Sequence, residues 1–312
     1  VCYLSIADDK YIDGFKKLTA AVHEAGGKTF LQLWQGGIAV SNDPTAEIVV
    51  PSDTPVAPGV VIPAATPERL WEAIRAFGVA ARRAVEAGFD GVEIHCGHNY
   101  LTHAMLSGGF NKRTDEWGGC LENRKKFPLE CIKEIRRNIP ENMPLSMRID
   151  CHDDFLEDGL TVEEVIDFCK DAGKAGVDLV NVSRGNIITP AAMYEVPPVD
   201  LPNGFNVEDA ARIRRETGLL VMPAGRINKP ELAEQILEDD KADLVIMSRA
   251  QIADPNFCNK AKAGEVDQIR YCLGCNHRRL DPNTDDIRRQ FFTHGNGFRM
   301  AILFGLLHKV IY

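Results

Sequence analysis

Along the first 265 residues two kinds of segment alternate, and they differ in how apolar and polar positions are arranged. Short apolar runs are followed by longer segments in which apolar residues recur at helical spacing, as at Ile12, Phe15 and Leu18. Strands that alternate with helices in this way predict a parallel sheet with right-handed crossover connections. We count six such units. The predicted strands cover residues 28–34, 90–95, 144–149, 177–183, 219–224 and 242–248.

The predicted helices carry recognisable signals at their ends. The Gly-Gly pair at 26–27 ends the first helix, and Thr66 and Pro67 start the second as N-cap and first helical residue. Thr161 and Glu164 have the spacing of a capping box. The predicted helices cover residues 8–25, 68–87, 121–138, 161–175, 206–217, 229–239 and 255–263, and the two longest predicted loops cover residues 38–66 and 96–120.

The regular repetition of these units favours a closed barrel over an open sheet. No dinucleotide-binding glycine fingerprint accompanies the repeat, although an open doubly wound sheet often carries one. A TIM barrel contains eight strand–helix units, so the six units of this chain leave the barrel two short. In such barrels the chemistry lies at the carboxyl ends of the strands, which is where we look for candidate residues.

The strand predicted at 90–95 ends in three polar side chains, His95, His98 and Tyr100. Two imidazoles three residues apart could bind a metal, although no Asp, Glu or Cys pattern completes a ligand set beside them. They could instead hydrogen-bond a substrate oxygen that gains negative charge, while Tyr100 supplies a proton. A surface or packed role is the third possibility, and spacing alone does not decide between the three.

Other predicted strand ends also offer candidates. Gln32 is a polar residue near the end of the first strand. Arg148 would point into a barrel core, where an arginine is costly unless it meets negative charge, and an ion pair with Asp150 or Glu93 is the structural alternative to a ligand.

The last two predicted strands end in turns that combine a small residue with an arginine. These turns are Gly225-Arg226 and Ser248-Arg249, and each precedes a predicted helix. Backbone N–H groups at a helix start, together with guanidinium groups, form the phosphate site of many barrels. The pair of turns therefore predicts a phosphate-binding site.

Composition and charge exclude several classes of protein. The net charge of −9, without a basic stripe, argues against a nucleic-acid partner and against attraction to an anionic membrane surface. No apolar stretch is long enough for a membrane helix, and Val1 to Leu4 lack a charged secretory leader. The nine scattered cysteines fit reduced thiols in a cytoplasm. We expect a cytoplasmic enzyme with a small-molecule partner, and the sequence leaves a homo-oligomer open.

Residues 88–124 carry a resemblance to a known family. The matching motifs are GFDGVEIH, then His-x-x-His-x-Tyr-Leu, then NKRTDEWGG-x-LENR. They resemble the old yellow enzyme family of NADH:flavin oxidoreductases, and in particular the bacterial 2,4-dienoyl-CoA reductases and 2-enoate reductases. The resemblance runs from about Asp8 to Asn276. It implies a TIM barrel of the FMN-dependent type, in which the first two strands are largely missing from this chain.

The resemblance also implies an activity, which is the reduction of the C=C bond of an enoate, enoyl-CoA or enone with electrons from NAD(P)H. His95 and His98 would hold the carbonyl oxygen, and Tyr100 would protonate the α-carbon. Gln32 would bind the flavin pyrimidine edge and Arg148 the negative charge of the reduced flavin. The resemblance assigns the FMN phosphate to Gly225, Arg226, Ser248 and Arg249.

The end of the chain departs from the family pattern. Cys272 and Cys275 match half of a four-cysteine iron–sulfur motif, but Arg279 stands where the third cysteine is expected and no cysteine follows. Relatives in this branch carry a 4Fe–4S cluster, FAD and NAD(P)H beside FMN. We expect residues 1–265 to form the FMN-binding barrel domain, and residues 266–312 an iron–sulfur remnant with a divergent tail that holds no stable cluster.

Two other functions remain open at this point. The first is a flavin-dependent amine dehydrogenase-like enzyme on the same barrel. The second is a non-catalytic barrel remnant, because missing strands expose sheet edges that barrels normally avoid.

Overall fold

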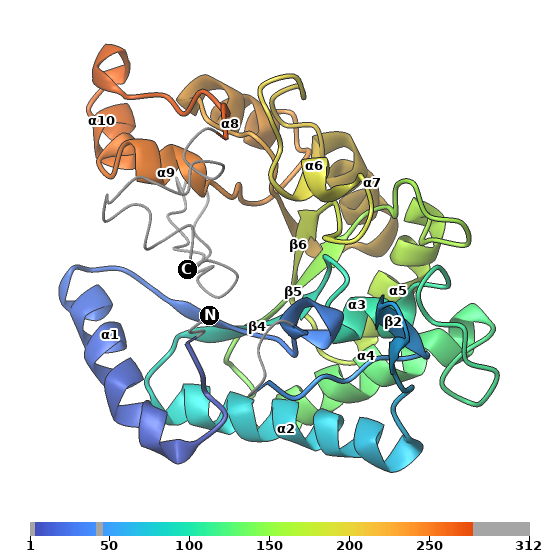
Figure 1. Cartoon of the computed structure of the whole chain (residues 1–312). Helices are drawn as coiled ribbons and strands as arrows, with labels where there is room; N and C mark the ends of the chain where they lie inside the picture. Colours follow the sequence, from blue (N-terminus) through green and yellow to red (C-terminus); the bar gives the residue numbers. More distant parts are fainter. Residues whose placement is uncertain (1–3, 42–45, 277–312) are drawn as a thin grey trace.

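The structure is a computed structural model that describes residues 4–41 and 46–276. Its centre is a parallel sheet in which the strand order follows the chain (Figure 1). Each neighbouring pair of strands is parallel, as the alternation of strands and helices predicts. The five strands are β1 (Phe30–Leu33), β4 (Gly91–Cys96), β5 (Leu145–Asp150), β6 (Leu179–Ser183) and β7 (Leu220–Pro223).

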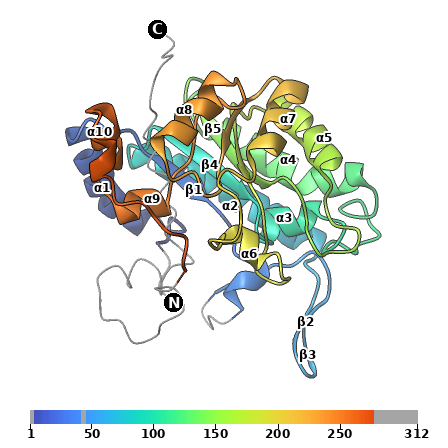
Figure 2. The same cartoon turned by 90° about the horizontal axis from the view of Figure 1, so that it is seen from above.

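The long helices cover the outer face of this sheet (Figures 1 and 2). Helix α2 packs against α4, and α5 packs against α7. Every residue of β4, β5 and β6 is buried, which explains why these strands read as nearly continuous apolar runs. The covering helices are α2 (Pro67–Glu86), α4 (Leu121–Arg137), α5 (Val162–Lys174), α7 (Val207–Thr217) and α8 (Pro230–Glu238).

The predicted capping signals are confirmed. The Thr66 side chain accepts a hydrogen bond from the Arg69 N–H, and Pro67 occupies the first turn of α2. Thr161 and Glu164 form the reciprocal hydrogen bonds of a capping box at the start of α5. These local signals fix where the helices begin, and therefore where the strand ends turn.

The prediction of a strand at 242–248 is wrong. Among the described residues this segment forms only an isolated bridge, in which Ile246 pairs with Ala224. The Ile246 N–H donates to the carbonyl of Pro223, but proline has no N–H to donate to the carbonyl of Leu244, as a continued parallel ladder requires. Within residues 4–41 and 46–276 no strand lies beyond it, so the sheet ends at β1 on one side and at this segment on the other.

Two elements lie inside segments predicted as loops. Residues 38–66 contain an antiparallel hairpin, β2 (Thr54–Ala57) and β3 (Val60–Ile62). Its turn is Pro58-Gly59, where Gly59 has a φ of 74°, as expected for the second central residue of a type II turn. Residues 96–120 contain α3 (Leu101–Leu106), and all six of its residues are buried.

The remaining elements lie near the two ends of the sheet. In Figure 1, α1 and α9 stand on the same side of the molecule, one at each end of the sheet. No helix in the described part of the chain is long and apolar enough to cross a membrane. These elements are η1 (Asp9–Tyr11), α1 (Ile12–Glu24), η2 (Gly37–Val40), α6 (Ala192–Glu195), α9 (Arg249–Ala253), α10 (Phe257–Lys262) and η3 (Val266–Gln268).

Candidate active site

One large cavity runs from the carboxyl ends of the parallel strands along β1 to residues of α1 and α2, such as Phe15 and Phe77. Its volume is about 1120 Å³, which is enough for a ligand larger than most drug-sized molecules. Strands β1, β4, β5 and β6 each contribute a polar residue to its wall, so the site is built on rigid elements rather than on loops alone. The predicted site residues on this wall are Gln32, His95, Tyr100, Arg148, Gly225, Arg226, Ser248, Arg249 and Cys272.

The side chains of β4, β5 and β6 that point to the cavity side form two stacked layers. The layer at the strand ends contains His95, Arg148 and Ser183, all of which line the cavity. Arg148 Nη2 donates to Ser183 Oγ at 2.9 Å. The layer below is centred on Glu93, a buried carboxylate that accepts three hydrogen bonds from neighbouring strands.

His95 and Tyr100 form an aromatic corner of the cavity. Their rings lie 4.7 Å apart at 84°, and Trp34 packs on the other side of Tyr100 at 4.6 Å. The Gly97 N–H donates to His95 Nδ1 at 3.1 Å. In neutral His95 the proton therefore lies on Nε2, which makes that nitrogen a hydrogen-bond donor. This corner places an imidazole donor and a phenol hydroxyl together, as the His-x-x-His-x-Tyr motif led us to expect.

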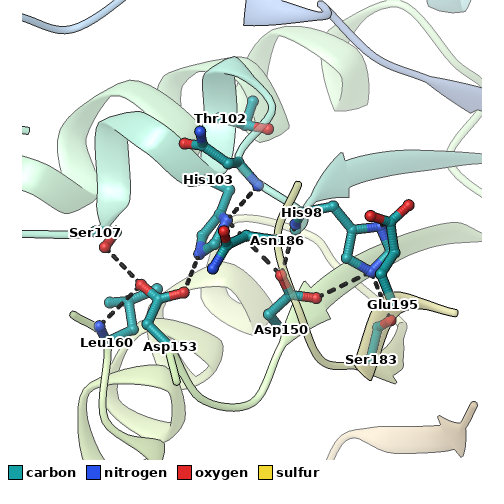
Figure 3. A network of polar contacts seen from close by, with 12 residues as sticks. His98, Thr102, His103, Ser107, Asp150, Asp153, Leu160, Ser183, Asn186 and Glu195 are labelled. Carbon is teal, nitrogen blue, oxygen red and sulfur yellow. Dashed lines mark hydrogen bonds and ion pairs between the residues drawn. The ribbon is translucent and has the colours of Figure 1, made fainter. Parts of the chain in front are cut away.

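His98 lies behind the wall rather than on it. Its side chain is completely buried, and it is absent from the residues that line the cavity. Its Nε2 lies 2.8 Å from Ser183 Oγ and 3.2 Å from Asp150 Oδ1 (Figure 3). Its Nδ1 lies 3.9 Å from Glu195 Oε1. The family resemblance gave His95 and His98 the same task, whereas the structure brings only His95 to the cavity and joins His98 to it through Ser183 and Glu195.

Asp150 at the end of β5 holds the turn that contains His98. The His98 backbone is left-handed, with a φ of 60°, and its N–H donates to Asp150 Oδ2 at 2.6 Å. A Cβ on the preceding Gly97 would lie 2.7 Å from Asp150 Oδ1, so this position accepts only glycine without a shift. The carboxylate therefore determines how the chain leaves β4 toward Tyr100.

Asp150 belongs to a buried cluster with His103 and Asp153 (Figure 3). His103 Nδ1 lies 3.7 Å from Asp150 Oδ2, and His103 Nε2 lies 3.0 Å from Asp153 Oδ1. Burial raises the pKa of Asp150 to about 7, against the opposing attraction of His103 and the His98 N–H. Burial also tends to raise the pKa of Asp153, but His103 and the hydrogen bonds from Ser107 and Leu160 outweigh it and lower that pKa to about 2.

The two predicted phosphate turns lie on the cavity wall, but their arginines contact the protein itself. Arg226 donates to the carbonyl oxygens of Pro198, Val199 and Leu201. Arg249 donates to Pro197 O at 2.8 Å and to Asn276 Oδ1 at 2.7 Å. Both guanidinium groups therefore hold the segment 197–201, which borders the cavity. The structure assembles the predicted residues in one region and adds partners that the sequence did not indicate.

Gly225 makes close approach possible in this region. Its φ is 138°, and a Cβ there would lie 2.8 Å from the Phe205 ring and 3.1 Å from Asn206 Nδ2. Only glycine fits this backbone and this space without a shift. Gly225 therefore brings the backbone to the cavity wall with no side chain of its own.

Cys272 and Cys275 lie at the end of the described chain. Cys272 lines the cavity, and its carbonyl accepts from Asn228 Nδ2 at 2.9 Å, whereas Cys275 is exposed. Among the described residues, neither belongs to a group of three or more potential metal ligands. Arg279 and the predicted tail 277–312 lie outside the described residues, so the iron–sulfur prediction stays a prediction.

The charged segment 111–124 is held by contacts within the protein. Arg113 and Asp115 form an ion pair within the segment. The exposed acid trio Glu122, Asp167 and Asp171 has the spacing of a cation site, but Lys125 Nζ lies 2.6–2.8 Å from all three carboxylates. The lysine already supplies the positive charge at this place.

Four residues that shape the site were not predicted as catalytic or cofactor-binding residues. Ser183 ends β6, and its position at a strand end was the signal that could have revealed it. Trp34 follows β1 in the same way. Tyr194 and Glu195 come from the irregular segment after β6, where no periodicity indicates which side chains face a cavity.

Comparisons with known proteins agree with this geometry. The family model described as "NADH:flavin oxidoreductase / NADH oxidase family" matches residues 3–268. The chain is 37% identical over 278 residues to the NADH oxidase of Thermoanaerobacter brockii. The aligned part makes up 88% of this chain and 42% of that enzyme. It is 31% identical over 283 residues to the cinnamate reductase of Clostridium sporogenes. The aligned part makes up 85% of this chain and 42% of the relative.

Solved structures show the same arrangement. The structure of 2-naphthoyl-CoA reductase in complex with 2-naphthoyl-CoA superposes with a TM-score of 0.78 at 30% identity, over 86% of this chain and 43% of that one. The chain thus spans less than half the length of these relatives. The strand order, the strand-end cavity and the family match over most of the chain agree, and the chain belongs to the NADH:flavin oxidoreductase family, that of old yellow enzyme.

Proposed function

We propose that this chain is the FMN-binding catalytic barrel of an enzyme that reduces the C=C bond of an α,β-unsaturated carbonyl compound with electrons from NAD(P)H. The observation that carries the proposal is the strand-end cavity, whose wall combines the donor pair His95 and Tyr100 with the cationic Arg148. The similarity to a cinnamate reductase supports an unsaturated acid or a derivative of one as the substrate.

The residues on the wall fit FMN. The cavity is large enough for it, and Arg148, Arg226 and Arg249 bring positive charge to a ligand whose phosphate is negative. The turn at Gly225 and Arg226 brings backbone and a guanidinium group to the same part of the wall, where they would meet a phosphate. Gln32 and Arg148 would hold the pyrimidine edge, while Gly225, Arg226, Ser248 and Arg249 would hold the phosphate.

The protein groups then have separate tasks during the reaction. When bound, FMN supplies a hydride for the β-carbon of the substrate. His95 donates from Nε2 to the carbonyl oxygen as negative charge develops there. Ser183 and Asp150 hold His98 behind this position. Tyr100, fixed between Trp34 and His95, delivers the proton to the α-carbon from its hydroxyl.

The proposal is tested by the oxidative half-reaction. The chain is loaded with FMN, reduced anaerobically with dithionite and mixed with cinnamate or with an α,β-unsaturated ketone or aldehyde, while flavin absorbance is followed. We expect the flavin absorbance to return and the saturated product to form. The saturated analogue serves as the control and should leave the spectrum unchanged.

The same protein also tests the amine dehydrogenase alternative. In that case an amine such as histamine would bleach the oxidised flavin, and none of the unsaturated compounds would restore the reduced one. That pair of results would overturn the proposal.

A further inference from the structure

We propose that Glu93 is a positioning residue that fixes the orientation of the Gln32 amide, so that the cavity presents an oxygen acceptor at this place. The ligand class it selects has an N–H donor flanked by carbonyl groups, as in the imide edge of a flavin. The inference rests on the proposed function in one respect, which is that the ligand is FMN. It adds a residue that does not itself line the cavity.

Glu93 sits one layer below the cavity, in the middle of β4. It is only 3% exposed, and its carboxylate joins four strands. Gln32 Nε2 on β1 donates to Glu93 Oε1 at 2.6 Å. Ser146 Oγ on β5 and Asn181 Nδ2 on β6 donate to Glu93 Oε2 at 2.8 and 3.0 Å. The strand register places Gln32 directly beside Glu93, and Glu93 directly beside Ser146.

An ionised carboxylate can only accept hydrogen bonds, and this property decides how an adjacent amide is turned. If Gln32 were flipped, its own oxygen would face Glu93 Oε1 at hydrogen-bond distance, oxygen against oxygen. The Asn181 amide shows the same effect. Its nitrogen faces Glu93, although this orientation leaves Asn181 Oδ1 buried without a hydrogen-bond partner among the described residues. The carboxylate therefore sets the direction of both amides.

Gln32 transmits this direction to the site because it reaches the cavity wall, whereas Glu93 does not. With Nε2 committed to Glu93, Oε1 is the acceptor that Gln32 can turn toward a ligand. A ligand N–H next to this oxygen gains a hydrogen bond, while a ligand that lacks the N–H leaves a desolvated acceptor unpaired.

The substitution Glu93→Gln changes this relation while nearly preserving size. The new amide can donate to Gln32 Oε1, so Gln32 can turn its NH2 group toward the cavity. We expect the variant to bind FMN about 10- to 100-fold more weakly, because a hydrogen bond to the ligand is lost or inverted. We also expect it to lose much of the preference for FMN over 3-methyl-FMN, in which the flavin N–H is blocked.

The experiment measures the dissociation constants of FMN and 3-methyl-FMN by flavin fluorescence for wild type, Glu93→Gln, Gln32→Ala and the double variant. In the Gln32→Ala background, Glu93→Gln should change the ratio of the two constants less than about twofold, because the residue through which it acts is gone. Ser146→Ala is the matched control, since it removes another donor to Glu93 without touching Gln32, and it should keep the wild-type ratio.

Three outcomes would overturn the inference. The ratio of the dissociation constants of FMN and 3-methyl-FMN could remain at its wild-type value in Glu93→Gln. Alternatively, Glu93→Gln could change this ratio equally in the wild-type and the Gln32→Ala backgrounds. If Glu93→Gln does not fold, as judged by circular dichroism, Glu93→Asp is measured instead. Aspartate keeps an acceptor-only group, so it should retain the preference for FMN even if affinity falls, and loss of that preference would contradict the role.

The inference and the proposed function fail in different ways. A wild-type chain that binds neither flavin would overturn the proposed function, and the flavin selectivity of Gln32 with it. A wild-type chain that binds FMN but tolerates Glu93→Gln with an unchanged ratio would overturn the positioning role alone.

Discussion

Strands β4, β5 and β6 are buried along their whole length, whereas β1 and the segment 242–248 at the two ends of the sheet are partly exposed. At the centre, site residues are held by hydrogen bonds with residues at the strand ends: the Gly97 N–H donates to His95, and Arg148 donates to Ser183. Near the far end, Arg226 and Arg249 contact backbone carbonyls of the segment 197–201. In the proposed function, the centre would carry the chemistry and the end would hold the ligand.

The largest effect is expected for Tyr100→Phe at the centre. If Tyr100 donates the proton, turnover of an unsaturated carbonyl compound should fall by roughly 10²- to 10⁴-fold, the usual contribution of a general acid. Flavin content should stay at the wild-type level, because the ring packing with Trp34 and His95 is retained. Single-turnover kinetics and flavin absorbance measure the two quantities separately. Loss of flavin with unchanged turnover per flavin would instead assign Tyr100 a structural role.

A matched pair of isoleucines tests the difference in packing between centre and end. Ile149 on β5 is 0% exposed, whereas Ile246 beyond β7 is only partly buried. Ile149→Ala should lower the free energy of unfolding by about 2–5 kcal/mol, since it leaves a cavity in the core. Ile246→Ala should lower the free energy of unfolding by less than half as much. Urea unfolding followed by circular dichroism gives both values, and equal losses would show that the end of the sheet is as tightly packed as its centre.

The buried Asp150 predicts an unusual dependence of stability on pH. Its pKa rises from 3.8 to about 7 in the folded chain, so between these values the folded state binds more protons than the unfolded state. The free energy of unfolding of the wild type should therefore fall by an amount on the order of a few kcal/mol as pH increases from about 4 to 7. It should fall less in Asp150→Asn, which lacks the titrating carboxyl group.

Other groups of the same cluster also titrate, and they set the limits of this comparison. Asp153, with its pKa near 2, should lose its stabilising contribution only as pH falls below about 4. His103, whose pKa is raised mainly by Asp153 against the opposing effect of burial, should contribute below its folded pKa in both proteins. Identical pH profiles for wild type and Asp150→Asn between pH 4 and 7 would show that Asp150 does not carry the effect.

The smallest expected effects concern the arginines at the end of the sheet. Arg226→Ala and Arg249→Ala should each weaken FMN binding by about 10-fold, the scale of one charged hydrogen bond, and inorganic phosphate should compete with FMN in wild type. Turnover per bound flavin should change little. Equilibrium dialysis measures how much FMN each variant retains. If both variants retain one FMN per chain, the phosphate site lies elsewhere.

The same contrast explains how much of the fold could be predicted. The central strands were predicted within about two residues, because burial on both faces leaves a continuous apolar run. The run at 242–248 looks the same in sequence, but a strand also needs a neighbour that can exchange hydrogen bonds, and Pro223 cannot donate one. The hairpin at 54–62 could not be predicted from an apolar run, because its two strands are short and mostly exposed.

The candidate site could be predicted in part. Strand ends indicated His95, Arg148 and Gln32, because their period places them on the cavity side of the barrel. The position of His98 depends on a left-handed backbone that the carboxylate of Asp150 stabilises from another strand, and no local pattern reveals such a contact. The carbonyl partners of Arg226 come from an irregular segment for the same reason.

The measurement that tests the central claim most directly is the absorption spectrum of the purified chain, followed by titration with FMN. If the strand-end cavity is an FMN site, the protein should show flavin bands or take up about one FMN per chain, and Arg249→Ala should weaken this uptake. A folded protein that carries no flavin, and that neither shifts nor quenches the FMN spectrum at any concentration tested, would contradict the claim.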